Sequence, residues 1–170
     1  MAQAQVVEKK QMRTPIESGC PDGMQFMHPL MVKNFGNWKY HDRPRPGVLH
    51  HVAYSGDEIW TVRVGTQRQL GPYEINLLCD IVDKYGEGHV RFTIRSNLEV
   101  MVSKWDKVGP LIQAFNDAGY PVGGTGNSVT MISHTQGWLH CDIPGTDASG
   151  VVKSLMDELH GEFIRGEMPN

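Results

Sequence analysis

At 170 residues the chain is long enough for one domain with a substantial core, and its net charge is −3. This near balance argues against broad electrostatic binding of nucleic acid, and no apolar run approaches the roughly 20 residues needed to cross a bilayer. Three widely spaced cysteines favour a reducing cytoplasm over a disulfide framework, so we expect a cytoplasmic protein without membrane insertion.

Residues 1–47 are predicted to form an N-terminal arm followed by an extended connection. Residues 1–25 are polar and lack a hydrophobic period, so they offer little apolar surface to offset the entropy lost on ordering. Pro44 and Pro46 then exclude a helix at the end of this segment and favour extended backbone.

From residue 48 the hydrophobic pattern predicts alternating strands and helices. Strands are expected at 48–54, 59–64, 89–95 and 98–102, with helices at about 72–85 and 106–119 and a β-like segment at 129–132. This order matches the split β-α-β plan of ferredoxin-like domains. We therefore expect an α+β fold with an antiparallel sheet, and a ferredoxin-like half domain over residues 48–122.

A last helix of about 15–20 residues is expected to begin at Asp147. Its apolar side chains repeat at helical spacing, and Thr146 or Asp147 can cap the first turn. It is most simply a core helix, although a contact with another subunit would also account for its apolar face.

Three arginines are candidate ligands for an anion. Arg91 and Arg95 are four residues apart, so on one strand they would share a face, and Arg63 on a neighbouring strand could reach it. Such guanidiniums repel one another unless an anion lies between them, and each charge-assisted pair contributes about 1.5–3 kcal/mol. The alternative is a solvated sheet face with local Asp and Glu partners.

Residues 134–141 concentrate two histidines, a tryptophan and a thiol. Cys141 is either a metal ligand or, more commonly, a small buried hydrophobic residue. Because the chain has no Cys-x-x-Cys, a metal held by Cys141 would need ligands from another segment or another chain. His134 and His140 could donate to an anion or be satisfied core histidines. The glycine-rich run at 123–126 could bind a phosphate or carboxylate through backbone amides, or simply form a turn.

Several motifs, in the same order, resemble the beta subunits of dissimilatory sulfite reductases. They lie at residues 33–38, 46–49, 60–65, 91–97, 123–126, 134–141 and 146–150, so the resemblance covers nearly everything from about residue 30 onward. It implies an oxidoreductase that interconverts sulfite and reduced sulfur by multi-electron transfer. In that family a siroheme is bridged to a four-iron, four-sulfur cluster through a cysteine thiolate. The implied partners are an alpha subunit, in a heterotetramer, and a sulfur-carrier or electron-donor protein.

The resemblance also implies roles for individual residues, none of them assigned as catalytic. Cys141 would be an iron–sulfur cluster ligand. The siroheme-binding residues would be Arg63, Arg91, Thr93, Arg95, Asn97, His134, Thr135, Gln136 and His140. Siroheme carries several carboxylates, which would supply the counter-charge that three neighbouring arginines need.

The resemblance further implies that residues 123–170 are the truncated start of a second, siroheme and iron–sulfur domain. The family takes its remaining cluster cysteines from a segment that would follow residue 170. Because one thiolate cannot hold a cubane cluster, we expect the isolated chain to lack the cluster and siroheme and to be inactive.

Other functions remain open from the sequence. One alternative is a non-catalytic ferredoxin-like module that binds a partner subunit. Another is an assimilatory sulfite or nitrite reductase, which shares the Arg-x-Thr-x-Arg pattern. An RNA-binding sheet has a compatible topology, but the charge balance and the lack of a paired-aromatic signature argue against it.

Overall fold

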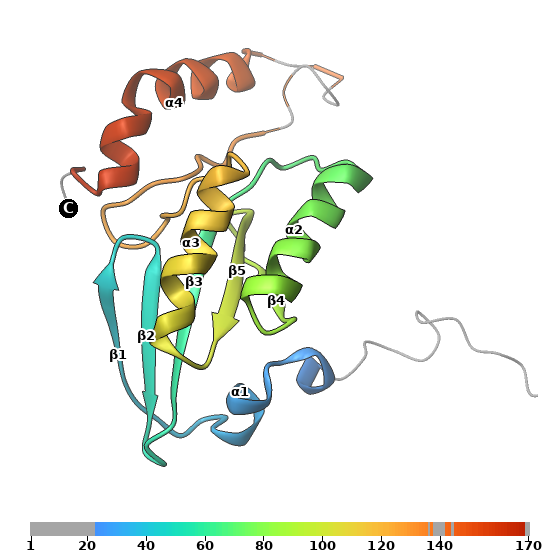
Figure 1. The fold of residues 1–170 in the computed structure, drawn as a ribbon. Coiled ribbons are helices and arrows are strands. Elements are labelled where there is room, and N and C mark those ends of the chain that lie inside the picture. The colour runs from blue at the N-terminus through green and yellow to red at the C-terminus, as the bar shows by residue number, and fades with distance from the viewer. Residues whose placement is uncertain (1–22, 136, 138–141, 144, 169–170) are drawn as a thin grey trace, which may run out of the picture.

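A five-stranded antiparallel sheet with two helices on one face forms the main body of the computed structural model (Figure 1). The structure describes residues 23–135, 137, 142–143 and 145–168. The strand order is β1-β2-β3-β5-β4. The strands are β1 (Trp38–Arg45), β2 (Val48–Ala53), β3 (Glu58–Gly65), β4 (Val90–Phe92) and β5 (Asn97–Val102). The expected α+β, ferredoxin-like fold is confirmed.

Helices α2 (Pro72–Tyr85) and α3 (Val108–Asp117) bury the apolar face of this sheet. Because side chains alternate along a strand, Val62 and Val64 of β3 face the helices while Thr61 and Arg63 face the opposite side. Phe115 of α3 is fully buried in this core. A short 3-10 helix, η2 (Trp105–Lys107), leads into α3, so the helix predicted from about residue 106 begins with a 3-10 turn.

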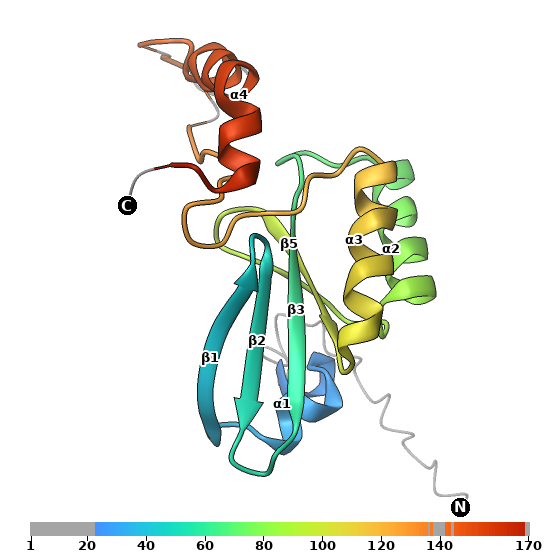
Figure 2. The ribbon, with the colours of Figure 1, turned by 60° about the vertical axis from the view of Figure 1, so that its left-hand side comes forward.

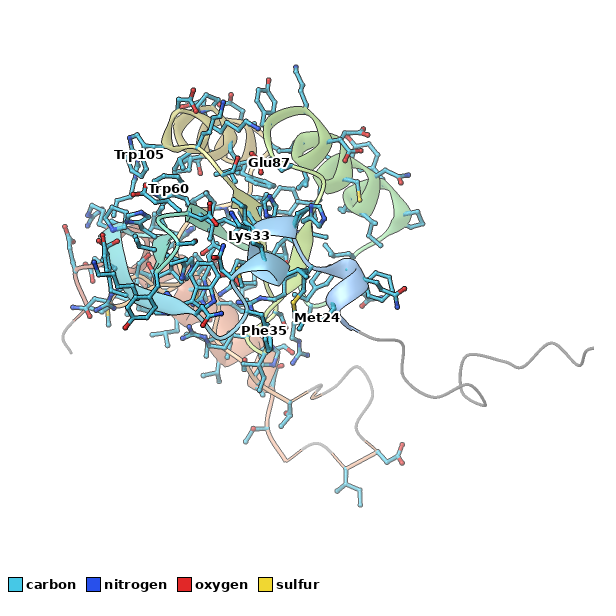
Figure 3. The ribbon with its side chains drawn as sticks, turned by 90° about the horizontal axis from the view of Figure 1, so that it is seen from below. Met24, Lys33, Phe35, Trp60, Glu87 and Trp105 are labelled. Atoms are coloured by element: carbon cyan, nitrogen blue, oxygen red, sulfur yellow. The ribbon has the colours of Figure 1, made fainter. Side chains whose placement is uncertain are left out.

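A second small unit, η1 (Gly23–Phe26) and α1 (Pro29–Lys33), lies at the end of the sheet remote from α4 (Figures 1 and 3). His28 caps α1 and its ring also contacts Glu87, with 2.7 Å between Nε2 and Oε2. Burial alone would raise the pKa of Glu87, but hydrogen bonds from Lys107 and Ser103 lower that pKa to about 2. This ionised carboxylate therefore joins α1 to the segments that follow α2 and β5.

Helix α4 (Ala148–Arg165) lies beyond the opposite end of the sheet, apart from α2 and α3 (Figure 2). The Asp147 side chain caps it by accepting from the Gly150 amide, as the sequence predicts. Phe163 is its only buried residue; on the expected apolar face Val151 and Leu155 are exposed and the other side chains are partly buried, so α4 is not a core helix. Within the described ranges, no helix combines the length and the apolar character that crossing a membrane requires.

Three sequence expectations about strands are wrong. Residues 38–45 form an edge strand rather than an extended connection, and Pro44 is tolerated at an irregularity of the β1–β2 register between Asp42 and Arg45. The predicted strand 89–95 is shortened to β4 because the chain turns at 93–96, where Ser96 has a φ of 58°. Residues 129–132 are not a strand, since the Val129 amide donates to the Phe163 carbonyl at the end of α4.

Candidate functional site

A buried carboxylate lies between two of the three arginines. Glu99 of β5 is 1% exposed and is paired in register with Arg63 on β3 and with Arg91 on β4. The Nε of Arg63 donates to Oε1 of Glu99 at 3.4 Å, and Nη2 of Arg91 donates to Oε2. A local acidic partner therefore satisfies part of the positive charge, which is the alternative that the sequence left open.

Arg95 reaches the same place by a different route from the one expected. It lies in the turn between β4 and β5, so the prediction that it shares a strand face with Arg91 is wrong. Its Nη2 donates to the Gly124 carbonyl at 3.4 Å, and Nη1 of Arg63 donates to the same carbonyl at 3.4 Å. The turn and the glycine-rich loop thus bring Arg95 next to Arg63 through a shared acceptor.

Thr93 and Asn97 hold this turn and the loop in position. The backbone N–H of Asn97 donates to Thr93 Oγ1 at 3.1 Å, and the backbone N–H of Thr93 donates to the backbone carbonyl of Asn97 at 2.8 Å. Asn97 is 3% exposed, and its Oδ1 accepts from Thr130 Oγ1 at 2.8 Å. A Cβ on Gly124 would lie 2.7 Å from Asn97 Nδ2, so only glycine allows this close approach. Both residues shape the backbone around the arginines.

His134 borders a cleft of about 390 Å³ between the end of β3 and α4, and Thr135 follows it in the chain. The cleft is lined in part by Arg68, His134 and Met156. Arg68 donates to the carbonyl oxygens of His134 and Thr135. The other sequence candidates of this segment, Gln136, His140 and Cys141, lie outside the described residues, so their predicted roles stay predictions.

The arginine cluster has the charge that an anionic group needs. The guanidiniums of Arg63 and Arg91 contact the Glu99 carboxylate, and that of Arg95 donates to the Gly124 carbonyl, which Arg63 also contacts. The residues present therefore fit a carboxylate-bearing cofactor. Within the described part of the chain, no group of three or more His, Cys, Asp or Glu side chains is placed to hold a metal ion.

The open face of the sheet also carries a row of imidazoles. The Nδ1 atoms of His41 and His51 are 2.6 Å apart, and His51 Nε2 is 3.2 Å from Thr61 Oγ1. Burial and then the neighbouring His41 lower the pKa of His51 to about 4. Both rings are therefore held close together with His51 neutral at neutral pH.

The sequence predictions missed Glu99 and Arg68. A signal for Glu99 was present, because a carboxylate within the apolar run Leu98–Val102 is rarely buried without a cationic partner. Arg68 carried no such signal, since its contacts are made with backbone carbonyls of a distant loop.

Comparisons with known proteins agree with this fold. Residues 51–118 match the family model described as the nitrite/sulfite reductase ferredoxin-like half domain. A solved structure, described as the crystal structure of dissimilatory sulfite reductase I, has a TM-score of 0.66 and 15% sequence identity. The match covers 76% of this chain and 33% of that chain. Because the sequence identity is only 15%, the structural similarity supports the fold alone.

Relatives with higher sequence identity share one name. The dissimilatory-type sulfite reductase subunit beta of Archaeoglobus fulgidus is 45% identical over 158 residues, covering 89% of this chain and 43% of that protein. The subunit of the same name from Nitratidesulfovibrio vulgaris is 47% identical over 152 residues, covering 85% of this chain and 40% of that protein. The chain thus spans less than half the length of these two relatives. Over the part that it spans, it is a homologue of dissimilatory-type sulfite reductase beta subunits, with a nitrite/sulfite reductase ferredoxin-like half domain at residues 51–118.

Proposed function

We propose that this chain acts within the beta subunit of a dissimilatory-type sulfite reductase, where its arginine cluster binds the carboxylates of siroheme. The observation that carries the proposal is the excess of charge around Glu99. Arg63, Arg91 and Arg95 converge there on one carboxylate and one carbonyl, which leaves the cluster cationic. The sequence similarity to beta subunits supplies the class of anion.

In this proposal the protein residues position charge and the cofactor supplies the redox chemistry. Siroheme, with an iron–sulfur cluster, provides multi-electron transfer to sulfite when it is bound. Arg91 is 54% exposed and Arg95 is also exposed, so their guanidiniums are available to carboxylates from solvent. Arg63 is 20% exposed and is fixed by Glu99 and Gly124, so it presents a donor whose position is set before binding.

Thr93 and Asn97 would act by holding the turn that carries Arg95. His134 and Thr135 would lie beside the siroheme, and Arg68 holds their backbone by donating to both carbonyl oxygens. Gln136 and His140 are proposed as further siroheme neighbours, and Cys141 as one ligand of the iron–sulfur cluster. The remaining ligands would have to come from other parts of the subunit, because one thiolate does not hold such a cluster.

The proposed partners are an alpha subunit and a sulfur-carrier or electron-donor protein, with sulfite as the substrate. The cationic surface suits this assignment, since sulfite is an anion and positive charge raises its local concentration. A cytoplasmic site of action belongs to the same proposal.

The test replaces Arg95 with alanine in the full-length subunit co-expressed with its alpha partner. Siroheme content per protein, measured from the optical spectrum of the extracted tetrapyrrole, should fall because one charge-assisted contact is lost. Lys153→Ala on α4 is the control, since among the described residues this cation pairs with Asp157 on its own helix. Siroheme content equal in both variants would contradict the proposal.

A second measurement separates the cluster from the tetrapyrrole. Cys141→Ser in the same complex should lower the iron and acid-labile sulfide content, because a serine hydroxyl is a poor replacement for a thiolate ligand. An unaltered iron and sulfide content would remove Cys141 from the set of ligands while leaving the arginine assignment intact.

A further inference from the structure

A row of neighbouring rings crosses the face of the sheet that carries α2 and α3. The members of this aromatic row are Tyr40 of β1, His50 of β2, Trp60 of β3 and Trp105 of η2. The rings of His50 and Trp60 are stacked, with their centroids 4.8 Å apart and 5° between their planes. The Tyr40 ring meets that of His50 edge-on at 6.2 Å, and the Trp105 ring lies 6.2 Å from that of Trp60.

The register of the strands sets the position of this row. Asp42 pairs with His50, and His50 pairs with Trp60, so the three side chains project from the same face of the sheet. Trp60 and Val62 are two residues apart on β3, so this is the face on which Val62 contacts the helices. Arg63 projects from the opposite face. The thickness of the sheet therefore separates the aromatic row from the arginine cluster.

The two ends of the aromatic row are open to solvent. Trp105 is 50% exposed and Tyr40 is 45% exposed, whereas Trp60 packs in part against the core. Figure 3 shows Trp60 and Trp105 next to each other at the outside of the molecule. Because Trp and Tyr side chains have only two torsions, rings held in such a row offer contact area to a ligand at a low entropic cost.

Two carboxylates flank the row, with a single imidazole between them. His50 Nδ1 donates to Asp42 Oδ1 at 3.1 Å, and His50 Nε2 is 3.5 Å from Glu58 Oε2. In the part of the chain that the structure describes, neither carboxylate has a Lys or Arg side chain within 4.0 Å. One imidazole carries at most one positive charge, so Asp42, Glu58 and His50 together keep at least one negative charge.

The Glu58 side of this group lacks a hydrogen-bond donor. Because His50 Nδ1 carries the proton that Asp42 accepts, Nε2 of the neutral ring is an acceptor. It faces a second acceptor, Glu58 Oε2, and among the described residues it has no hydrogen-bond partner. The Glu58 side chain is 46% exposed, so a donor from outside the chain can reach its carboxylate.

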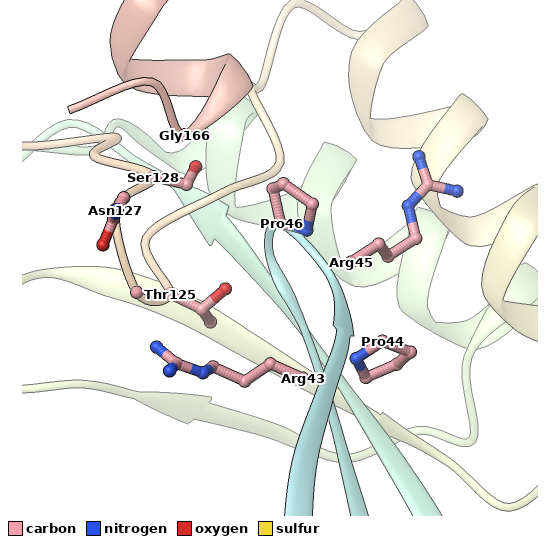
Figure 4. A pocket seen from close by; sticks show the side chains of 9 residues that line it. Arg43, Pro44, Arg45, Pro46, Thr125, Asn127, Ser128 and Gly166 are labelled. Atoms are coloured by element: carbon pink, nitrogen blue, oxygen red, sulfur yellow. The ribbon is translucent and has the colours of Figure 1, made fainter. Parts of the chain in front are cut away.

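Basic side chains of the neighbouring segments do not fill this place. Arg43, which follows Asp42 on β1, extends instead toward the loop at 125–128 (Figure 4). Lys104 precedes Trp105 in the chain but is paired with neither carboxylate. No Lys or Arg side chain of the described ranges lies over a ring of the aromatic row. Both the rings and the carboxylates are therefore free to meet a cation from another molecule.

We propose that the aromatic row, with Asp42 and Glu58, is a docking surface for an arginine side chain of a partner protein. A guanidinium is planar, so it stacks on an indole or phenol ring while its edge donates to a carboxylate. A lysine ammonium has no such plane and acts as a point charge. Negative charge on this surface complements the positive charge of the partner and orients it. The inference does not rest on the proposed function, because Arg63 and Glu99 lie on the opposite face of the sheet.

Indole N–H resonances of Trp60 and Trp105 in the isotopically labelled chain test the surface. The probe is a capped glycine peptide with one central arginine, and the reference peptides carry lysine or citrulline, the neutral analogue of arginine, at that position. The arginine peptide should shift both resonances and saturate, the lysine peptide should bind at least about threefold more weakly, and the citrulline peptide should not saturate. Absence of saturation with arginine, or equal binding of citrulline, overturns the docking surface. Lysine binding as tightly as arginine overturns the choice of arginine.

Variants assign the binding to these side chains. Trp105→Ala should weaken binding of the arginine peptide at least about threefold, and Asp42→Asn combined with Glu58→Gln at least about fivefold. Tyr73→Ala and Asp80→Asn are the matched controls, since both residues are exposed on α2 and lie outside the row. They should leave the affinity unchanged. If the Trp105 and carboxylate variants bind as tightly as these controls, the assignment is overturned.

A second copy of the chain is the competing occupant, because the chain has exposed arginines of its own, such as Arg91. In that case the Trp60 and Trp105 resonances would move with protein concentration in the absence of peptide, and Trp105→Ala would abolish the movement. Such self-association overturns the assignment to a partner protein. Resonances that do not depend on protein concentration support it.

Discussion

The sheet with α2 and α3 and the segment containing α4 are stabilised in different ways. Four of the ten residues of α3 are buried, including Phe115, and α3 has no side-chain hydrogen bond at its N-cap. One of the eighteen residues of α4 is buried, Phe163, yet this helix has an Asp147 cap and ends at Gly166 with a φ of 74°. Tertiary burial holds α3, whereas α4 depends largely on its own ends.

The same contrast separates the two groups of arginines. Arg63 and Arg91 lie within the register of the sheet and share the buried Glu99. Arg43 is outside that network, next to a loop that joins the sheet to α4. Glu99 thus compensates part of the charge inside the sheet, whereas in the part of the chain that the structure describes no acidic group lies within 4.0 Å of Arg43.

The largest effect should come from the core of the sheet. Phe115→Ala leaves a cavity at a fully buried site, so we expect the free energy of unfolding to fall by about 3–5 kcal/mol, measured by urea denaturation. Phe35→Ala is the control, because this phenylalanine is 58% exposed and should cost less than about 0.5 kcal/mol. Similar losses for both variants would show that burial does not distinguish the core from the surface.

The buried carboxylate should come next. Glu99→Gln leaves two guanidiniums without their counter-charge, so we expect a loss of about 2–4 kcal/mol in the same denaturation experiment. Glu58→Gln, at the exposed start of β3, should have little effect. If Glu99→Gln is as stable as the unaltered chain, Glu99 positions Arg63 and Arg91 without stabilising the fold.

Much of the sheet was predictable because its strands repeat apolar residues every second position. Helix α2 was predicted at 72–85 and is found at Pro72–Tyr85, since Pro72 and Gly86 mark its ends. Strand β1 was missed because its side chains are almost all exposed, Pro44 lies within it and Pro46 follows it. Its formation depends on pairing with β2, which no local pattern records.

The candidate site was predictable in its residue types but not in its geometry. Arg63 and Arg91 were expected to meet from neighbouring strands; β5 lies between β3 and β4 instead, and its Glu99 brings the two arginines together. Arg95 was placed on a strand because the residues before it have strand-like propensity. Its true position depends on the left-handed Ser96 and on the carbonyl of Gly124, far away in the sequence.

A local effect is expected for the phenylalanine of α4. Phe163→Ala should lower the free energy of local opening of α4 by about 2 kcal/mol, since this side chain is 4% exposed but packs at the edge of the structure. Hydrogen exchange should quicken along α4 and remain unchanged in β3 and β5. Val151→Ala, at a position 67% exposed, is the control. Faster exchange in β3 would mean that α4 and the sheet unfold together.

The imidazole row should make the sheet sensitive to acid. The pKa of His51 is lowered from 6.5 to about 4, so the unfolded chain binds its proton first as the pH falls. The His51 contribution is complete above about pH 6.5 and is lost between pH 6.5 and 4. After discounting for solvent screening, it amounts to about 1 kcal/mol.

Nuclear magnetic resonance titration of His51 measures this shift. In His41→Gln the pKa of His51 should rise, because the like charge of His41 is one cause of the lowering. An unchanged pKa in that variant would exclude His41 as a cause and leave burial as the main one, with His50 and Arg91.

The smallest effect should be confined to the first turn of α4. Asp147→Ala removes the acceptor for the Gly150 amide, 3.0 Å away, and should cost about 0.5–1 kcal/mol of local stability. Asp157→Ala, which removes only the surface pair with Lys153, should cost about 0.3 kcal/mol, because exposed pairs on a helix are screened by water. Amide exchange of Val151 and Val152 reports the difference. Because α4 has so little buried surface, its cap should matter more than its ion pair; the reverse order would mean that this helix is held by its surface charges.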